Sequence, residues 1–237
     1  VREIRGEAED EWNAPADLYV RDEVIYLLDN GNNRIIRLDG AGNTLGILAI
    51  DPQEVSLQDA SGIFVDTDGK IYVTLTEQQT VEVFDQDGTR LQSIQPPASN
   101  VIASDVVYAP SKVGNDDRIY VVSTNVYQGI LQFSREGEFL RFFGSNRVTE
   151  SLSTVIGNFF RRFFTNAQKS QMEQVLPTEL SSLDIDERGF IYSSSAVTDD
   201  SKNELKKYDV EGNNILAYDH SPAQDVVMGT GDYGDIE

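Results

Sequence analysis

The feature that most constrains this fold is a segment that recurs four times along the chain. Each copy begins with an Ile-Tyr dipeptide, continues through a second short strand and reaches a turn that contains Gly. The pairs begin at Ile25, Ile71, Ile119 and Ile191, spaced 46, 48 and 72 residues apart, and the turn glycines are Gly42, Gly88, Gly137 and Gly212. Because Gly and Asx residues favour chain reversals, each copy predicts a meander of short antiparallel strands.

A further short apolar strand is predicted before each Ile-Tyr pair. The predicted positions are 16–20, 61–66, 104–109 and 181–186. Each unit would then contain four strands: this one, the Ile-Tyr strand, a third strand, and a fourth after the Gly turn. A repeat of about 40 to 50 residues with four strands is typical of a propeller blade, whose sheet packs face to face on its neighbours around an axis. The prediction is an all-β propeller.

The first copy resembles the core of an NHL repeat. Its residues YLLDNGNNRIIRLDGAGN (26–43) follow the pattern strand, Asp, Asn-Asn-Arg, strand, Asp and Gly. The second copy departs from the pattern, with Leu75 in place of Asp29 and Gln79-Thr80 in place of Asn33-Arg34. The resemblance implies four-stranded NHL-type blades over nearly the whole chain, with Asp29 and Arg34 tying strands and blades together. It implies no single function, because NHL propellers include enzymes, RNA binders and protein scaffolds.

The repeats predict four blades in a single domain that spans residues 1–237. NHL propellers usually have five or six blades. The resemblance therefore predicts that these four blades belong to a larger ring and that the chain is part of a longer propeller. A closed four-bladed ring is the alternative.

The long interval before the fourth copy contains an insertion at residues 147–177. Apolar residues recur there at helical spacing, and Pro177 ends the pattern, which predicts a helical hairpin between blades 3 and 4. Its candidate docking residues are Phe159, Phe160, Arg161, Arg162, Phe163 and Phe164. Either the phenylalanines pack on the propeller while the arginines pair with its acidic surface, or the hairpin docks on a membrane or a partner protein.

The charge of the chain excludes some classes of partner. Forty acidic residues against 19 basic ones give a net charge of −21, which repels nucleic acid and anionic lipid headgroups. The sequence has no apolar run of membrane-spanning length, so membrane association would require a missing tether or the insertion. Cys is absent, which excludes thiol catalysis and Cys-ligated metals. This absence and a similarity to bacterial extracytoplasmic NHL proteins lead us to expect an extracytoplasmic protein, secreted or membrane-tethered.

Two candidate chemical sites have simpler structural explanations. Asp66, Asp68 and Glu77 match positions 1, 3 and 12 of an EF-hand loop, but Lys70 stands where the loop needs a ligand and no Gly follows it. We therefore expect a hairpin turn there. His220 is the only histidine and is expected to be a surface residue. A calcium-dependent lactonase similar to the senescence-marker and gluconolactonase family stays open, because such a site can use Glu, Asp and Asn.

The candidate binding site is the mouth of the propeller channel. The first residues of each innermost strand should face the axis, and in the predicted register they are small or polar. The candidates are Asp17, Ser61, Ser104, Asp105, Ser181 and Ser182. Two carboxylates with hydroxyls can bind a cation or a polyol, although crowding at the axis is the plainer explanation. The expected role is non-catalytic binding or scaffolding of a protein or a carbohydrate, without a cofactor. The alternative is a calcium-dependent hydrolase or lactonase with Ca²⁺ at this mouth.

Overall fold

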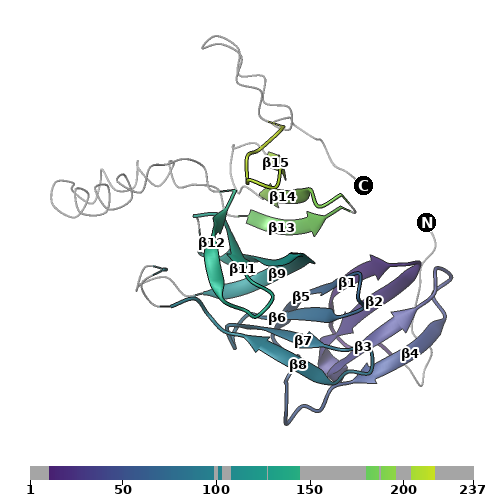
Figure 1. The fold of residues 1–237 in the computed structure, drawn as a ribbon. Coiled ribbons are helices and arrows are strands. Elements are labelled where there is room, and N and C mark those ends of the chain that lie inside the picture. The colour runs from purple at the N-terminus through teal and green to yellow at the C-terminus, as the bar shows by residue number, and fades with distance from the viewer. Residues whose placement is uncertain are drawn as a thin grey trace, which may run out of the picture.

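The protein contains four antiparallel β-sheets that follow one another around a common axis (Figure 1). The computed structural model describes residues 11–98, 101–102, 108–126, 128–144, 180–186, 188–195 and 204–216. Within these ranges there is no α-helix, and consecutive strands of each sheet pair with one another. This is the arrangement of propeller blades, so the prediction of an all-β propeller is confirmed.

Blades 1 to 3 each contain four strands. Blade 1 has β1 (Pro15–Arg21), β2 (Val24–Asp29), the short 3₁₀ helix η1 (Asn30–Asn32), β3 (Arg34–Leu38) and β4 (Thr44–Ala49). Blade 2 has β5 (Ala60–Val65), β6 (Ile71–Leu75), β7 (Thr80–Phe84) and β8 (Arg90–Ile94). Blade 3 has β9 (Ala109–Asp116), β10 (Arg118–Thr124), β11 (Ile130–Phe133) and β12 (Phe139–Phe143). In each case the first strand is the innermost.

Blade 4 is smaller within the described residues. It has β13 (Leu180–Ile185), β14 (Ile191–Ser195) and β15 (Glu204–Tyr208). Where the repeat predicts a fourth strand, the described residues form only a bridge between Tyr208 and Asn214. Contacts between inner strands run from β1 to β5, from β5 to β9 and from β9 to β13.

The sequence pattern placed one inner strand wrongly. The strand that pairs with β10 is β9, Ala109–Asp116, and not residues 104–109. The prediction followed an apolar run that ends at Tyr108 and Ala109. Tyr108 precedes β9, and its ring is buried in the core between blades 2 and 3. An apolar side chain in a connecting segment was therefore mistaken for part of the strand.

One turn geometry recurs six times in the part of the chain that the structure describes. An Asp or Ser side chain accepts hydrogen bonds from the backbone N–H groups two and four residues later. The Gly three residues after it has a φ between 77° and 92°, a region that L side chains rarely adopt. The six accepting residues are Asp39, Asp66, Asp85, Ser134, Asp186 and Asp209. The Asx and Gly clusters of the sequence therefore do form the predicted reversals.

The Ile-Tyr pairs of blades 2 and 3 each join their blade to both neighbouring blades. Because successive residues of a strand point to opposite faces, the Ile and the Tyr lie on different sides of the sheet, called here the Ile side and the Tyr side. The Tyr side of each blade packs on the Ile side of the next. The paired residues in the three cores are Tyr26 with Ile71, Tyr72 with Ile119, and Tyr120 with Ile191.

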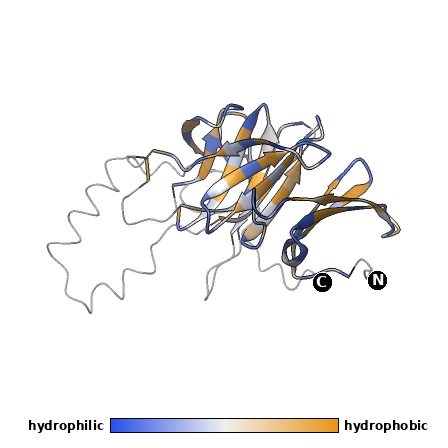
Figure 2. Ribbon diagram, turned by 90° about the horizontal axis from the view of Figure 1, so that it is seen from below, coloured by the Kyte–Doolittle hydropathy of each residue, from blue (hydrophilic) through white to orange (hydrophobic). Residues whose placement is uncertain are grey.

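The hydrophobic core lies between the sheets. Hydrophobic residues follow the strands while the turns are mostly hydrophilic (Figure 2). The central strand β6 is buried along its whole length, and β10 is buried over most of it. Burying one such Val, Ile or Phe side chain contributes about 1.5 to 3 kcal/mol relative to leaving it exposed. Packing between sheets is therefore the main source of stability.

The NHL-like residues of the first copy form a buried polar knot. The Asp29 carboxylate accepts hydrogen bonds from Arg34 Nε (2.7 Å), Asn32 Nδ2 (2.9 Å) and the backbone N–H of Asn13 (2.7 Å). Asn30 donates to the carbonyl of Ala60 in blade 2. The Asp29 and Arg34 contacts tie β2 and β3 to the segment before β1, as the resemblance implied for strands, whereas the contact with the next blade comes from Asn30.

The predicted helical insertion at 147–177 lies outside the described residues. The same holds for its six candidate docking residues and for His220. Among the residues that the structure describes, no helix is long and apolar enough to cross a membrane.

Candidate functional site

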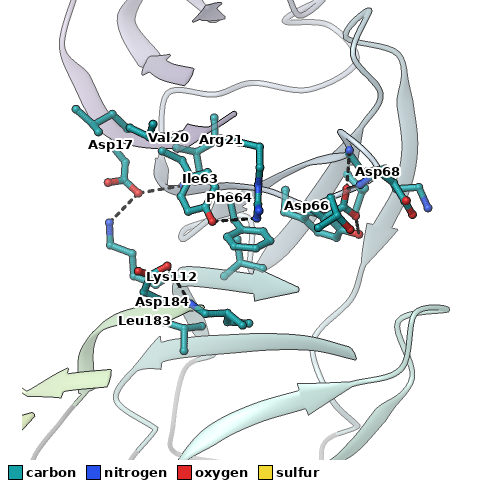
Figure 3. Close-up of a pocket in the computed structure, with 18 of the residues that line it drawn as sticks. Asp17, Val20, Arg21, Ile63, Phe64, Asp66, Asp68, Lys112, Leu183 and Asp184 are labelled. Atoms are coloured by element: carbon teal, nitrogen blue, oxygen red, sulfur yellow. Dashed lines mark hydrogen bonds and ion pairs between the residues drawn. The ribbon is translucent and has the colours of Figure 1, made fainter. Parts of the chain in front are cut away.

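A cavity of about 870 Å³ follows the axis of the propeller (Figure 3). All four inner strands, β1, β5, β9 and β13, contribute to its wall, and it extends over blade 2 to Val83 of β7 and to Leu91 and Gln92 of β8. Charged, aromatic and aliphatic side chains all line this wall. Its volume lies within the range of about 300 to 1,000 Å³ that is typical of small-molecule binding sites.

An ion pair crosses the axis at one end of the cavity. Lys112 Nζ of β9 lies 2.8 Å from Asp17 Oδ2 of β1, and the same oxygen accepts a hydrogen bond from the backbone N–H of Ile63 in β5 (3.0 Å; Figure 3). Asp17 therefore links three blades. Both charged side chains remain partly exposed to solvent, so they combine a structural contact with donors and acceptors that a ligand can reach.

The inner strands share a β-bulge that fixes the register of these groups. In every blade one residue near the start of the inner strand has no partner on the second strand. The bulged residues are Ala16, Ser61, Ser111 and Ser181, and the residues that follow them are Asp17, Gly62, Lys112 and Ser182. A bulge re-aims the side chains next to it. It is thus the repeated device that presents Asp17 and Lys112 at the same level.

At the level of Asp17, the described inner strand of blade 3 presents a lysine and not a carboxylate. Because β9 begins at Ala109, the position equivalent to Asp17 in blade 3 is Lys112 and not Asp105. Ser104 and Asp105 lie outside the described residues. The sequence contained a signal for the correct register. In the other three blades this position lies eight or nine residues before the Ile of the Ile-Tyr pair. Lys112 lies seven residues before Ile119, whereas Asp105 lies much further from it.

The structure separates the predicted serines into two groups. Ser182 lines the cavity together with Asp17. Ser61 and Ser181 do not line it, because they are the bulged residues and their hydroxyls bond within the blade walls. The Ser61 hydroxyl shares hydrogen bonds with the Thr76 and Thr74 hydroxyls (2.7 and 3.1 Å), and that of Ser181 donates to the carbonyl of Ser194 (3.2 Å).

An aromatic side chain and a carboxylate from different blades, Tyr19 and Asp184, line the same cavity. Tyr19 packs against Phe64 with ring centroids 4.7 Å apart, and its hydroxyl accepts a hydrogen bond from Arg21. Burial raises the pKa of Tyr19, the Arg21 charge opposes this, and the Asp184 charge adds to it. Asp184 is exposed and lines the same cavity. Sequence reasoning missed Tyr19 and Asp184, because only the fold brings β1 and β13 to one cavity.

The other end of the cavity is formed by hairpin turns. Asp66 Oδ1 accepts hydrogen bonds from the backbone N–H groups of Asp68 (2.9 Å) and Lys70 (2.8 Å). Its other oxygen accepts one from the Tyr72 hydroxyl, whose pKa is raised by burial and by the Asp66 charge. Asp66 and Asp68 of the EF-hand-like segment thus belong to a hairpin turn, as expected, and Glu77 follows the next strand. Within the described ranges, no three His, Cys, Asp or Glu side chains converge as metal ligands.

Comparisons with known proteins support the fold. No protein-family model matches the chain, and no curated protein matches it. A protein of unknown function from Bacteroides caccae superposes with a TM-score of 0.53 at 14% identity, over 85% of this chain and 65% of that one. The likeness shows a shared fold.

Two other solved structures are less similar. One is a catalytically inactive virginiamycin B lyase from Staphylococcus aureus, solved with quinupristin (TM-score 0.48, 12% identity, 86% of this chain and 58% of that one). Another is an extracellular domain from B. thetaiotaomicron described as part of a hybrid two component system (TM-score 0.47, 12% identity, 90% and 24%). This chain spans less than two thirds of the length of each of the three.

Proposed function

We propose that this protein is a non-catalytic, extracytoplasmic binding propeller that holds a carbohydrate in its axial cavity. The observation that supports this most directly is the composition of the cavity wall around the Asp17–Lys112 pair (2.8 Å). The blades are proposed to be of the NHL type, on the resemblance of residues 26–43. The lack of Cys and the acidic surface agree with an exported protein that does not bind nucleic acid.

The wall has the chemistry that a polyhydroxylated ligand requires. Sugar hydroxyls both donate and accept hydrogen bonds. Lys112 is a donor, Asp17 and Asp184 are acceptors, and the Ser182 hydroxyl can do either. Hydrogen bonds to charged groups are about twice as strong as those between neutral ones. Tyr19 adds an aromatic surface with a polar tip.

The positions of the charges favour binding over a role in bond cleavage. The Lys112 ammonium and the Asp17 carboxylate contact each other, and the Asp17 carboxylate also accepts a hydrogen bond from the Ile63 N–H. They are therefore oriented by the fold before any ligand arrives. Pre-oriented polar groups confer specificity on a binding site. A protein ligand that engages the same end of the propeller is the other occupant expected from the sequence.

Glycan binding by the purified chain tests this proposal. A panel of neutral mono- and oligosaccharides is screened on an array, and each hit is measured by isothermal titration calorimetry. Lys112→Met removes the donor and keeps the aliphatic stem, so we expect affinity to fall by about tenfold or more. Asp184→Ala should weaken binding without affecting the fold, since Asp184 is exposed.

Arg188→Ala is the matched control, because Arg188 is exposed and lies outside the cavity. It should bind like the wild type. If the wild type binds no glycan, or if Lys112→Met binds as tightly as the control, the proposal is wrong. Binding that EDTA abolishes would instead support the calcium-dependent alternative.

A further inference from the structure

Arg21 brings an unpaired positive charge into the axial cavity. It is the last residue of β1, it is half-buried, and it lines the cavity. Among the described residues Arg21 forms no ion pair, whereas the Lys112 ammonium in the same cavity is paired with Asp17. A guanidinium stays charged at every physiological pH and can only donate hydrogen bonds. Arg21 is therefore a donor that an anionic group of a ligand can use.

The fold holds the Arg21 guanidinium by one edge. Its Nε and Nη2 atoms both donate to the carbonyl of Val65 (3.1 and 3.0 Å), and Nη2 also donates to the Tyr19 hydroxyl (3.2 Å). The guanidinium carbon lies 5.6 Å from the ring centroid of Tyr19 and 5.9 Å from that of Phe64, and Figure 3 shows Arg21 beside Phe64. Within the described residues Nη1 has no partner, and it is not one of their buried unpaired atoms. The group is thus oriented in advance with its Nη1 hydrogens available.

The Tyr19 hydroxyl is a second available donor beside the first. Its oxygen accepts the hydrogen bond from Arg21, and no acceptor among the described residues takes its own hydrogen. Burial raises the pKa of Tyr19, so this hydroxyl is protonated at neutral pH and can donate. The Arg21 charge acts on Tyr19 more strongly than the Asp184 charge does. The surroundings of this hydroxyl therefore favour an anion.

Several acidic side chains around the cavity are already engaged. Asp17 pairs with Lys112, and Asp117 pairs with Arg135, each at 2.8 Å. Asp66 accepts hydrogen bonds within its own hairpin. Surface charges further away than about 8 Å are largely screened at physiological ionic strength. The net charge of −21 therefore does not keep a single carboxylate from Arg21.

We propose that Arg21 Nη1 and the Tyr19 hydroxyl form a carboxylate subsite, and that the ligand of the cavity is an acidic sugar, a uronate. This inference rests on the proposed carbohydrate function and narrows it. The two donors match the two oxygens of a carboxylate, whereas sulfate and phosphate have more oxygens than these donors can serve. Arg21 and Asp17 are four residues apart on β1, about 13 Å at 3.3 Å per residue. Further sugar residues can therefore reach the Asp17–Lys112 pair while the carboxylate is bound at Arg21.

Matched pairs of sugars test the subsite. Glucose, galactose and mannose are each compared with the corresponding uronate by isothermal titration calorimetry at neutral pH, and glucose 6-sulfate is included. We expect a uronate to bind at least about tenfold more tightly than its neutral partner, because hydrogen bonds to charged groups are the stronger ones. Arg21→Met should abolish this preference, and Tyr19→Phe, which keeps the ring, should reduce it severalfold.

Arg141→Met is the matched control. Arg141 is exposed and lies outside the cavity, and its guanidinium carbon lies 5.3 Å from the ring centroid of Phe143, a contact of the same kind as that of Arg21 with Phe64. The variant loses the same charge and should keep the preference for the uronate. Thermal unfolding followed by circular dichroism checks that each variant is folded.

Arginine modification tests the same contact without a substitution. Phenylglyoxal reacts with accessible guanidinium groups, and tryptic mass spectrometry follows Arg21 and Arg141 in the same sample. Glucuronate should slow the modification of Arg21 severalfold and leave that of Arg141 unchanged, and glucose should protect Arg21 less than glucuronate does.

The outcomes separate the subsite from the wider carbohydrate proposal. Equal affinity of the wild type for uronates and neutral sugars would overturn the subsite and leave the carbohydrate proposal standing. Unchanged modification of Arg21 in saturating glucuronate would also overturn the subsite. Tighter binding of the sulfate than of glucuronate would overturn the assignment to a carboxylate. Protection by glucuronate without binding of any neutral sugar would support the subsite and contradict the proposed binding at the Asp17–Lys112 pair.

Discussion

Replacing Arg34 by Ala should destabilise the protein far more than a surface substitution does. The Asp29 carboxylate is fully buried, and the Arg34 guanidinium lies 2.7 Å from it. Removing one partner of a buried pair typically costs about 3 to 5 kcal/mol, because the other charge stays buried without compensation. Asp29 keeps its hydrogen bonds from Asn32 and from the Asn13 N–H. We therefore expect the lower end of this range, about 3 kcal/mol.

Urea denaturation followed by circular dichroism measures this loss. For a chain of this size about 3 kcal/mol corresponds to a fall in Tm of roughly 6 to 12 °C. Arg188→Ala is the matched control, because Arg188 is 73% exposed and lies 3.5 Å from Asp186. An exposed pair of this kind contributes about 0 to 1 kcal/mol.

The double variant Asp29→Asn with Arg34→Ala isolates the pair. Removing both charges should be less damaging than the sum of the two single changes, with a coupling energy of about 0.5 to 3 kcal/mol. The reasoning is refuted if Arg34→Ala is no less stable than Arg188→Ala. It is also refuted if Arg34→Ala loses ligand affinity while its stability is intact, since the knot would then be a binding site.

Three further predictions concern the blades. Tyr72→Ala should lower the free energy of unfolding by about 3 to 5 kcal/mol, because Tyr72 is buried between two blades. Tyr192→Ala should cost less than half of that in this chain, because Tyr192 is only partly buried. Equal losses would contradict the assignment of the Tyr side and the Ile side. Hydrogen bonds from the asparagine four residues later lower the pKa of Asp39 and of Asp209 in the folded protein. The urea concentration at the unfolding midpoint should therefore be constant above about pH 5 and fall as the pH drops through these lowered pKa values. A midpoint concentration that rises in acid would contradict this. Gly62→Val should cost about 1 to 3 kcal/mol, because a Cβ there would lie 2.5 Å from a carbonyl oxygen of β9; an unchanged Tm would show that the two strands can separate freely.

Local patterns predicted most of the blade architecture. The Ile-Tyr pairs mark the second strand of each blade, because in blades 2 and 3 both faces of that strand are covered by neighbouring sheets. The Asp and Gly of each turn are recognisable because the turn needs a side-chain acceptor and a positive φ. These requirements act within a few residues, so a single sequence contains them.

The failures of prediction have a different physical origin. β9 reads APSKVGND, with few apolar residues, because an inner strand is crowded and faces the axis as well as its neighbours. Hydropathy therefore favoured the segment that ends at Tyr108. The Asp17–Lys112 contact joins residues of two blades that are distant in the sequence. Its existence depends on the rotation of each blade relative to the last, which no local pattern encodes.

A zero-length chemical cross-link between Asp17 and Lys112 tests the central claim most directly. Carbodiimide activation joins a carboxylate to an amine only when the two are in contact, and both side chains are accessible enough to react. If the blades surround one axis as described, tryptic mass spectrometry should find an amide bond between Asp17 and Lys112, and it should be lost in Lys112→Met. If Asp17 instead links to other lysines while no Asp17–Lys112 product forms, blades 1 and 3 do not meet across a common axis.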